Sequence, residues 1–145
     1  MMNEHSVTQA VRGELNGLGW NVISVDFPSG SGGIRLHSNN RSPDSKHGES
    51  IVPDIIAHKG QTLLIVECAG TKKGFSHDDV TKLRDIAEGE YSNSIERRFR
   101  ATSWQNLKYG IGLPREEAPS REDIPSHIDL VVTVDQSDDV TLAEI

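Results

Sequence analysis

The sequence is poor in cysteine and in aromatic residues. It has one cysteine and 5% aromatic residues in 145 positions. A single cysteine excludes an internal disulfide framework and a zinc site built on several cysteines, and the six histidines lack metal-ligand spacing. No apolar run approaches a membrane span, and the first residues lack the apolar core of a signal peptide. We therefore expect a soluble, cytoplasmic protein that does not enter a membrane.

Basic residues are in the minority as well. There are 15 Lys and Arg against 22 Asp and Glu, which gives a formal net charge of -7. The bulk composition therefore predicts no polyanionic partner, and nucleic-acid binding would have to be local. The densest basic segment, ERRFRATSW, is equally compatible with a patch that grips phosphates and stacks a base on Trp104, and with a charged helix face carrying one core aromatic.

The length fits one domain over residues 1–145. Apolar periodicity predicts helices over residues 7–18 and 76–91, and strands over 20–27, 51–58, 61–70, 104–114, 127–135 and 140–145. The strand over 61–70 is apolar on both faces except at Glu67, as in a central strand covered on both sides. Helices interleaved with a mixed sheet predict a three-layer α/β domain, bordering on α+β.

A long loop is expected over residues 28–50. This segment is rich in Gly, Ser, Asn and charge and carries one weak strand signal, IRLH. Arg35, Arg41 and Lys46 make it locally basic, so we expect it to contact a phosphate backbone and to order on binding. On composition alone, an insertion without function is an equal alternative.

Two acidic residues in short apolar runs are the most informative feature. Asp54 lies in IVPDIIAH and Glu67 in QTLLIVECAG. A hairpin that reverses about Lys59 and Gly60 places Asp54 opposite Ile65 and Glu67 two residues further along on the same face. Both carboxylates can then reach one Mg²⁺ ion. A three-residue loop would instead send them to opposite faces.

These residues carry a family resemblance. The order of helix, strand, loop, Val-Pro-Asp, hairpin, Val-Glu-Cys-Ala and helix resembles the PD-(D/E)XK nuclease superfamily, which has the restriction-endonuclease-like fold, and it covers most of the chain. The resemblance implies that Asp54, Glu67 and the backbone carbonyl of Cys68 bind a catalytic Mg²⁺, with Mn²⁺ as a substitute. It also implies a glutamate from the first helix in the metal shell, for which Glu4 is preferred over Glu14.

The sequence departs from the family at the lysine that helps to activate water. Ala69 stands at that position. The resemblance implies that another lysine supplies the cation, and Lys82 on the following helix is preferred over Lys72 and Lys73 because a helix positions a side chain more tightly than a loop does. Lys73 is otherwise a DNA-binding candidate, together with Arg97, Arg98 and Arg100. A solvated surface charge is the plain alternative for each lysine.

Three functional classes follow. The first is a Mg²⁺-dependent DNA endonuclease of restriction, repair or defence type, which the resemblance implies to be a homodimer and to be able to join a larger defence or restriction complex. The second is a catalytically silent subunit of the same fold that serves as a structural or DNA-binding component. The third is an unrelated α/β binding domain in which the two acids coincide by chance.

Overall fold

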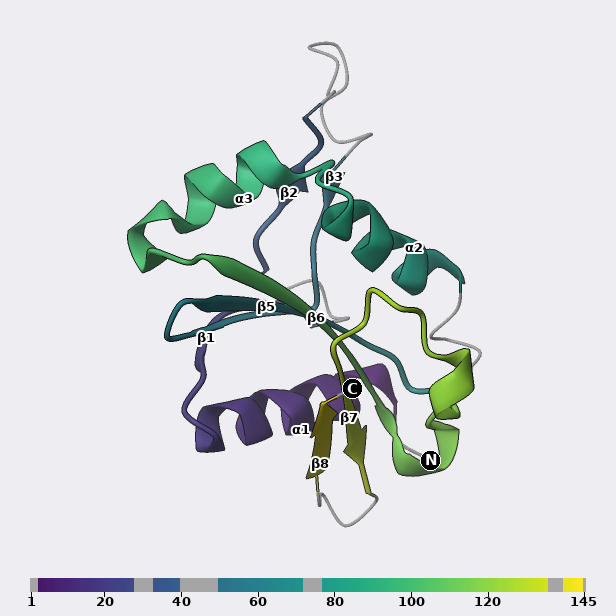
Figure 1. Cartoon of the computed structure of the whole chain (residues 1–145). Helices are drawn as coiled ribbons and strands as arrows, with labels where there is room; N and C mark the ends of the chain where they lie inside the picture. Colours follow the sequence, from purple (N-terminus) through teal and green to yellow (C-terminus); the bar gives the residue numbers. More distant parts are fainter. Residues whose placement is uncertain (1–2, 28–32, 40–49, 72–76, 136–139, 145) are drawn as a thin grey trace.

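The computed structural model describes residues 3–27, 33–39, 50–71, 77–135 and 140–144. Six strands form a mixed sheet in the order β1-β4-β5-β6-β7-β8 (Figure 1). The β5–β6 and β6–β7 pairs are parallel, and the other pairs are antiparallel. The strands of this sheet are β1 (Asn21–Val25), β4 (Ile55–Lys59), β5 (Thr62–Cys68), β6 (Asn106–Pro114), β7 (Leu130–Val134) and β8 (Val140–Glu144). The predicted α/β class is confirmed.

Helix α1 (Glu4–Gly17) covers one face of the sheet. It begins at Asn3, whose side chain accepts a hydrogen bond from the Ser6 N–H at 2.8 Å and so satisfies one of the free amides of the first turn. Three apolar residues at helical spacing, Val7, Val11 and Leu15, are fully buried against the sheet. Leu18, which the periodicity assigns to the same face, is 44% exposed because it lies beyond the last helical turn.

Strand β5 is the central strand that its composition predicts. Leu63 and Ile65 belong to the apolar cluster on one side of the sheet, whereas Leu64 and Val66 belong to the cluster under α1. Alternation along a strand explains this division, because successive side chains point to opposite faces. Glu67 is the exception to the apolar pattern, and it is 0% exposed.

The turn between β4 and β5 differs by one position from the predicted hairpin. Lys59 pairs with Thr62, so the two turn residues are Gly60 and Gln61 rather than Lys59 and Gly60. Gly60 has a φ of 60°, which glycine adopts without a steric penalty. The loop still has two residues, so the face of each side chain is unchanged, and the three-residue alternative is excluded. The shift in pairing brings Asp54, directly before β4, opposite Glu67.

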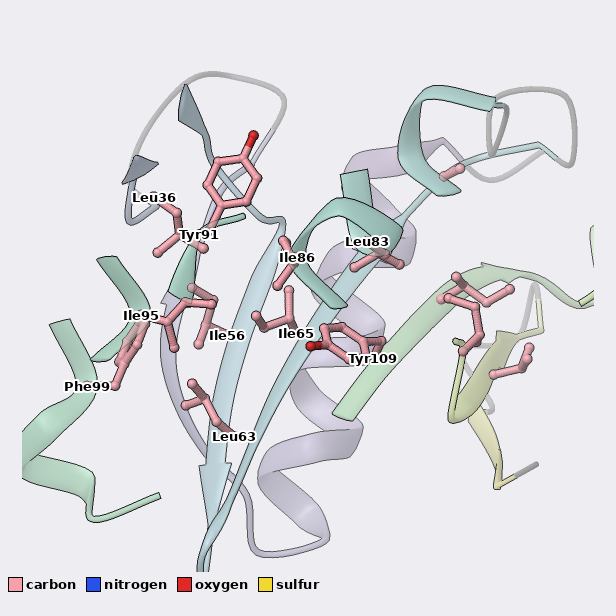
Figure 2. Close-up of a cluster of buried hydrophobic side chains, with 14 of the residues drawn as sticks. Leu36, Ile56, Leu63, Ile65, Leu83, Ile86, Tyr91, Ile95, Phe99 and Tyr109 are labelled. Atoms are coloured by element: carbon pink, nitrogen blue, oxygen red, sulfur yellow. The ribbon is translucent and has the colours of Figure 1, made fainter. Parts of the chain in front are cut away.

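Helices α2 (His77–Ala87) and α3 (Ser92–Phe99) cover the other face. Leu83 and Ile86 of α2 and Phe99 of α3 pack on the β4–β5 hairpin, as Figure 2 shows. Ala87, at the end of α2, is exposed. The basic segment contributes Arg97 and Arg98 to helix α3, whose buried aromatic is Phe99, while Trp104 is only partly buried, and its binding to DNA stays a prediction.

Part of the expected loop forms a small second sheet. β2 (Leu36–His37) pairs with β3 (Ser50–Ile51), so the weak strand signal in IRLH is confirmed. The backbone N–H of His37 donates to Oγ of Ser94 at 3.1 Å, which ties this sheet to α3. Residues 28–32 and 40–49, with Arg41 and Lys46, lie outside the described residues. Among the described helices, none combines the length and the apolar character needed to cross a bilayer.

The packing of α1 on β6 generates a stability prediction. A Cβ atom at Gly112 would lie 3.0 Å from Cγ2 of Val11 and 3.1 Å from Sγ of Cys68, so Gly112→Val should lower the free energy of unfolding by about 1–3 kcal/mol through overpacking. Gly13→Ala is the control, because nothing lies within 4 Å of its Cβ position, and it should raise stability by up to about 1 kcal/mol. Urea unfolding measures both. Equal stability of Gly112→Val and wild type would contradict this packing.

Candidate active site

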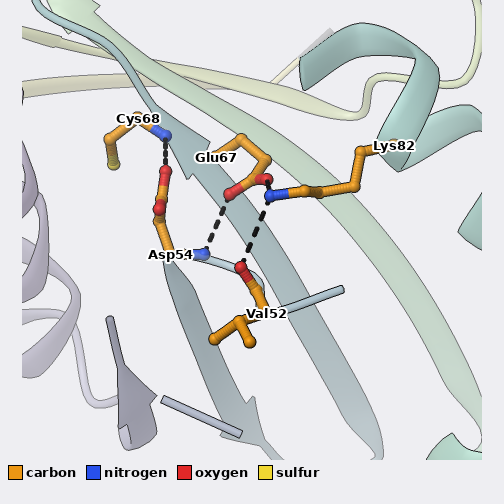
Figure 3. A network of polar contacts seen from close by, with 5 residues as sticks. All are labelled: Val52, Asp54, Glu67, Cys68 and Lys82. Atoms are coloured by element: carbon orange, nitrogen blue, oxygen red, sulfur yellow. Dashed lines mark hydrogen bonds and ion pairs between the residues drawn. The ribbon is translucent and has the colours of Figure 1, made fainter. Parts of the chain in front are cut away.

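The candidate site lies at the end of the β4–β5 hairpin away from the turn (Figure 3). The backbone N–H of Asp54 donates to Oε2 of Glu67 at 2.9 Å, and the backbone N–H of Cys68 donates to Oδ2 of Asp54 at 2.8 Å. Each carboxylate is therefore held by the backbone of the neighbouring strand. This reciprocal arrangement holds the two acids next to each other at the end of the sheet.

Lys82 supplies the cation of the site from helix α2. Its ammonium forms an ion pair with Oε1 of Glu67 and lies 3.4 Å from the carbonyl oxygen of Val52. Ala69 is 4% exposed and packs in the cluster that contains Leu83, the residue after Lys82. Lys82 therefore brings a positive charge to Glu67 from the neighbouring helix, while residue 69 is a buried alanine. Lys72 and Lys73 lie outside the described residues.

Burial dominates the electrostatics of the two acids. Desolvation raises the pKa of Asp54 to about 8, with a further contribution from the charge of Glu67. Desolvation also raises the pKa of Glu67, although the ammonium of Lys82 opposes that shift. For Lys82, burial is the largest single cause and lowers the pKa, but the charge of Glu67, the hydrogen bond to it and the charges of Asp54 and Asp79 together outweigh burial, so the pKa is raised. Lys82 is therefore a stable ammonium at neutral pH.

Glu4 approaches the site from the opposite layer. It lies in the first turn of α1, and its pKa is raised by burial and then by the charge of Asp54. Asp26 contributes to the same shift, and its backbone N–H donates to the carbonyl of Asp54 at 2.8 Å. The sequence did not single out Asp26, although its place directly after a strand could have done so. Glu14 instead lines a groove beside Val140.

Other candidates do not meet at the carboxylates. The side chains of Arg97, Arg98 and Arg100 are exposed at the end of α3 and just beyond it. The chain then enters β6 at Asn106, which pairs with Thr62 at the turn end of the hairpin, away from Glu67. Arg35 donates to Oγ of Ser50 at 2.9 Å beside β2 and β3. These four arginines therefore remain candidates for contacts with DNA away from the two carboxylates, not at them.

A scan against protein-family models and a search of curated proteins returned no match. Within the described part of the chain, no three His, Cys, Asp or Glu side chains are grouped closely enough to hold a metal by themselves. The site therefore offers two carboxylates and one ammonium. It also offers the Cys68 backbone, while burial raises the pKa of the Cys68 thiol and keeps it protonated.

The raised carboxylate pKa values predict a pH-dependent stability. Between about pH 4 and pH 8, folded Asp54 keeps a proton that the unfolded chain has lost, so stability falls as pH rises through this window. Asp54→Asn removes this titration and retains an oxygen that can accept the Cys68 N–H. We expect the variant to gain about 1–3 kcal/mol relative to wild type at pH 8 compared with pH 5.

Urea unfolding at the two pH values measures this difference. Glu116→Gln is the matched control, since it also removes one carboxylate, from an exposed position. If the free energy of unfolding changed with pH in parallel for wild type and Asp54→Asn, the raised pKa of Asp54 would be contradicted.

Proposed function

We propose that this protein is a metal-dependent endonuclease that hydrolyses phosphodiester bonds in DNA and has a restriction-endonuclease-like core. One observation carries the proposal: Asp54 and Glu67 converge at the end of a central strand, and an ammonium reaches Glu67 from a helix in the layer above. The arrangement agrees with the resemblance in strand order, hairpin and helix, and it provides a cation where the motif lysine is missing.

The two carboxylates fit a divalent cation. Burying a carboxylate in an apolar strand is costly unless a positive charge compensates it. Oε1 of Glu67 is buried and, among the described residues, meets only the ammonium of Lys82. Mg²⁺ is commonly held by one or two carboxylates, with waters and substrate phosphate oxygens completing its shell. Asp54 and Glu67 would hold Mg²⁺ or Mn²⁺ here, with the carbonyl of Cys68, and Glu4 would complete the shell.

When bound, the ion would polarise the phosphodiester and lower the pKa of the attacking water. The chain's own groups would orient the reactants. Lys82 is charged, so its ammonium would act as a hydrogen-bond donor to the attacking water and to the negative charge that develops on the phosphate, rather than as a general base. The Asp54 and Cys68 backbone N–H groups would keep both carboxylates in place during the reaction.

The silent-subunit alternative also has a specific observation in its favour. The ion pair between Lys82 and Glu67 and the raised pKa of Asp54 give the site a charge balance that needs no metal. A structural or DNA-binding subunit would keep this pair as a stabilising contact. The two functions differ in one measurable property, because only the nuclease requires the site to bind a divalent cation.

Removing either carboxylate charge should abolish cleavage. We expect Asp54→Asn and Glu67→Gln to lose Mg²⁺-dependent plasmid nicking by at least about a hundredfold, because each loses a metal ligand. We also expect millimolar Mg²⁺ to raise the thermal midpoint of wild type and not of either variant, since a ligand that binds only the folded state stabilises it.

Glu116→Gln again serves as the control and should behave as wild type in both measurements. A wild-type midpoint that does not respond to Mg²⁺ or Mn²⁺, together with no nicking, would decide for the silent subunit.

Lys82 should act on the chemical step rather than on DNA binding. We expect Lys82→Met to lower the single-turnover rate by about a hundredfold or more while the DNA dissociation constant changes by less than about threefold. Lys108→Met is the control, because Lys108 lies on β6 opposite Leu64 and away from the carboxylates. A single-turnover rate equal to that of wild type in Lys82→Met would transfer the role to Lys72 or Lys73, or to no lysine.

A further inference from the structure

A small apolar pocket lies next to the candidate site on the face covered by α2. Its volume is about 150 Å³. The walls come from α2, from β6 and from the segment that connects β6 to β7, and the residues that line it are Val80, Ile111, Leu113, Pro119, Asp123, Ile124 and Pro125. We call this cavity the β6 pocket.

The β6 pocket is one strand away from the carboxylates. Ile111 is the register partner of Glu67 in the parallel β5–β6 pair, and neighbouring strands are about 4.8 Å apart. Ile111 packs in the same apolar cluster as Leu83 of α2, so it points to the layer from which Lys82 reaches Glu67. A group in the pocket and a group at the carboxylates can therefore belong to one nucleotide.

The segment that connects β6 to β7 is tied to both α2 and β6. A ring nitrogen of His127 lies 3.2 Å from the carbonyl oxygen of Val80, and the Asp129 N–H donates to the carbonyl of Tyr109 at 2.7 Å. These contacts hold the connecting segment against the helix and the strand. The pocket is thus bounded on three sides by elements that are tied to one another.

The chemistry of the β6 pocket fits a flat, mostly apolar ring. A cavity of about 150 Å³ with aliphatic walls accommodates a benzene-sized ring, which is the size of a pyrimidine and smaller than a purine. Two prolines and four aliphatic side chains offer apolar contacts. One carboxylate, the exposed Asp123, lies at the solvent side of the lining and accepts a hydrogen bond from Oγ of Ser120 at 2.7 Å. A carboxylate oxygen is the natural acceptor for the amino group of cytosine.

We propose that the β6 pocket receives one unstacked pyrimidine base, with cytosine preferred, from the nucleotide next to the bond that is cleaved. This inference rests on the proposed nuclease function and names its substrate class. A base inside an intact duplex is stacked and paired, so it cannot enter such a pocket without leaving the helix. The preferred substrate is therefore single-stranded DNA or a duplex with an unpaired cytosine.

The first experiment tests base binding without cleavage. Deoxycytidine, which carries no phosphate, is titrated into the metal-free protein while the methyl signals of Ile111, Leu113 and Ile124 are followed by NMR. We expect saturable shifts of these signals in wild type. Ile124→Phe should abolish the shifts because the added ring fills the cavity. If Ile124→Phe shows no cooperative thermal transition and is therefore not folded, Val80→Phe is used as the filled variant in its place.

The control variant is Leu18→Phe, which enlarges an exposed side chain at the far end of α1. It should give the wild-type shifts. Shifts that are absent in wild type, or that persist unchanged in the filled variants, would overturn the base-binding assignment.

The second experiment tests the substrate class by cleavage. One sequence is supplied as a single strand, as a duplex, and as single strands with one abasic position moved along the chain. We expect wild type to cleave the single strand at least about tenfold faster than the duplex, and one abasic position next to the cut to slow cleavage there by at least about tenfold. Ile124→Phe should bring both ratios to within about threefold of unity, and Leu18→Phe should not.

The outcomes separate the two proposals. Equal cleavage of single strand and duplex, with no abasic effect, would overturn the pocket inference and leave the nuclease proposal intact. No cleavage of any substrate with Mg²⁺ or Mn²⁺, combined with saturable deoxycytidine shifts at the three methyl signals, would overturn the nuclease proposal and support the β6 pocket as a base-binding site.

Discussion

The charge of Glu67 inside the central strand is the constraint on which the site depends. This side chain is 0% exposed, and an isolated carboxylate at such a position would cost several kcal/mol or would stay protonated. Two groups from other elements compensate it, the backbone N–H of Asp54 and the ammonium of Lys82. The segment that leads into β4 and one turn of α2 are thereby fixed against the end of β5.

The division of β5 into two apolar faces explains why the site draws on both helical layers. Lys82 comes from α2, above the sheet, and Glu4 from the first turn of α1, below it. The sheet ends near Asp54, so a side chain from either layer can influence the same carboxylates without crossing the core. The influence of Glu4 is visible as a pKa raised by burial and then by Asp54. The acidic residues therefore gather where the central strands β4 and β5 end, away from their turn.

The sequence predicts much of this arrangement because the main signals are periodic. Alternation in β5 and a two-residue turn fix the common face of Asp54 and Glu67, whichever residues occupy the turn. The exact turn could not be predicted, since Gly60 fits either of its two positions. Helix α2 is predicted by Leu83 and Ile86, but the contact between Lys82 and Glu67 depends on how the helix docks. The distance between the carboxylates and the arginines at the end of α3 likewise depends on tertiary packing and could not be predicted from the sequence.

The ion pair of Lys82 has a consequence for the proposed chemistry. Under the proposed function, Oε1 of Glu67, which Lys82 neutralises, would also be an oxygen that Glu67 offers to a divalent cation. Lys82 would then turn its ammonium away from that oxygen, with the Val52 carbonyl, 3.4 Å away, as a neighbouring acceptor. Loss of the contact with Glu67 would also remove the main influence that raises the pKa of Lys82. Under the proposed function, the Lys82 ammonium would then be free to donate a hydrogen bond to the attacking water, so the same lysine would both neutralise Glu67 and orient a reactant.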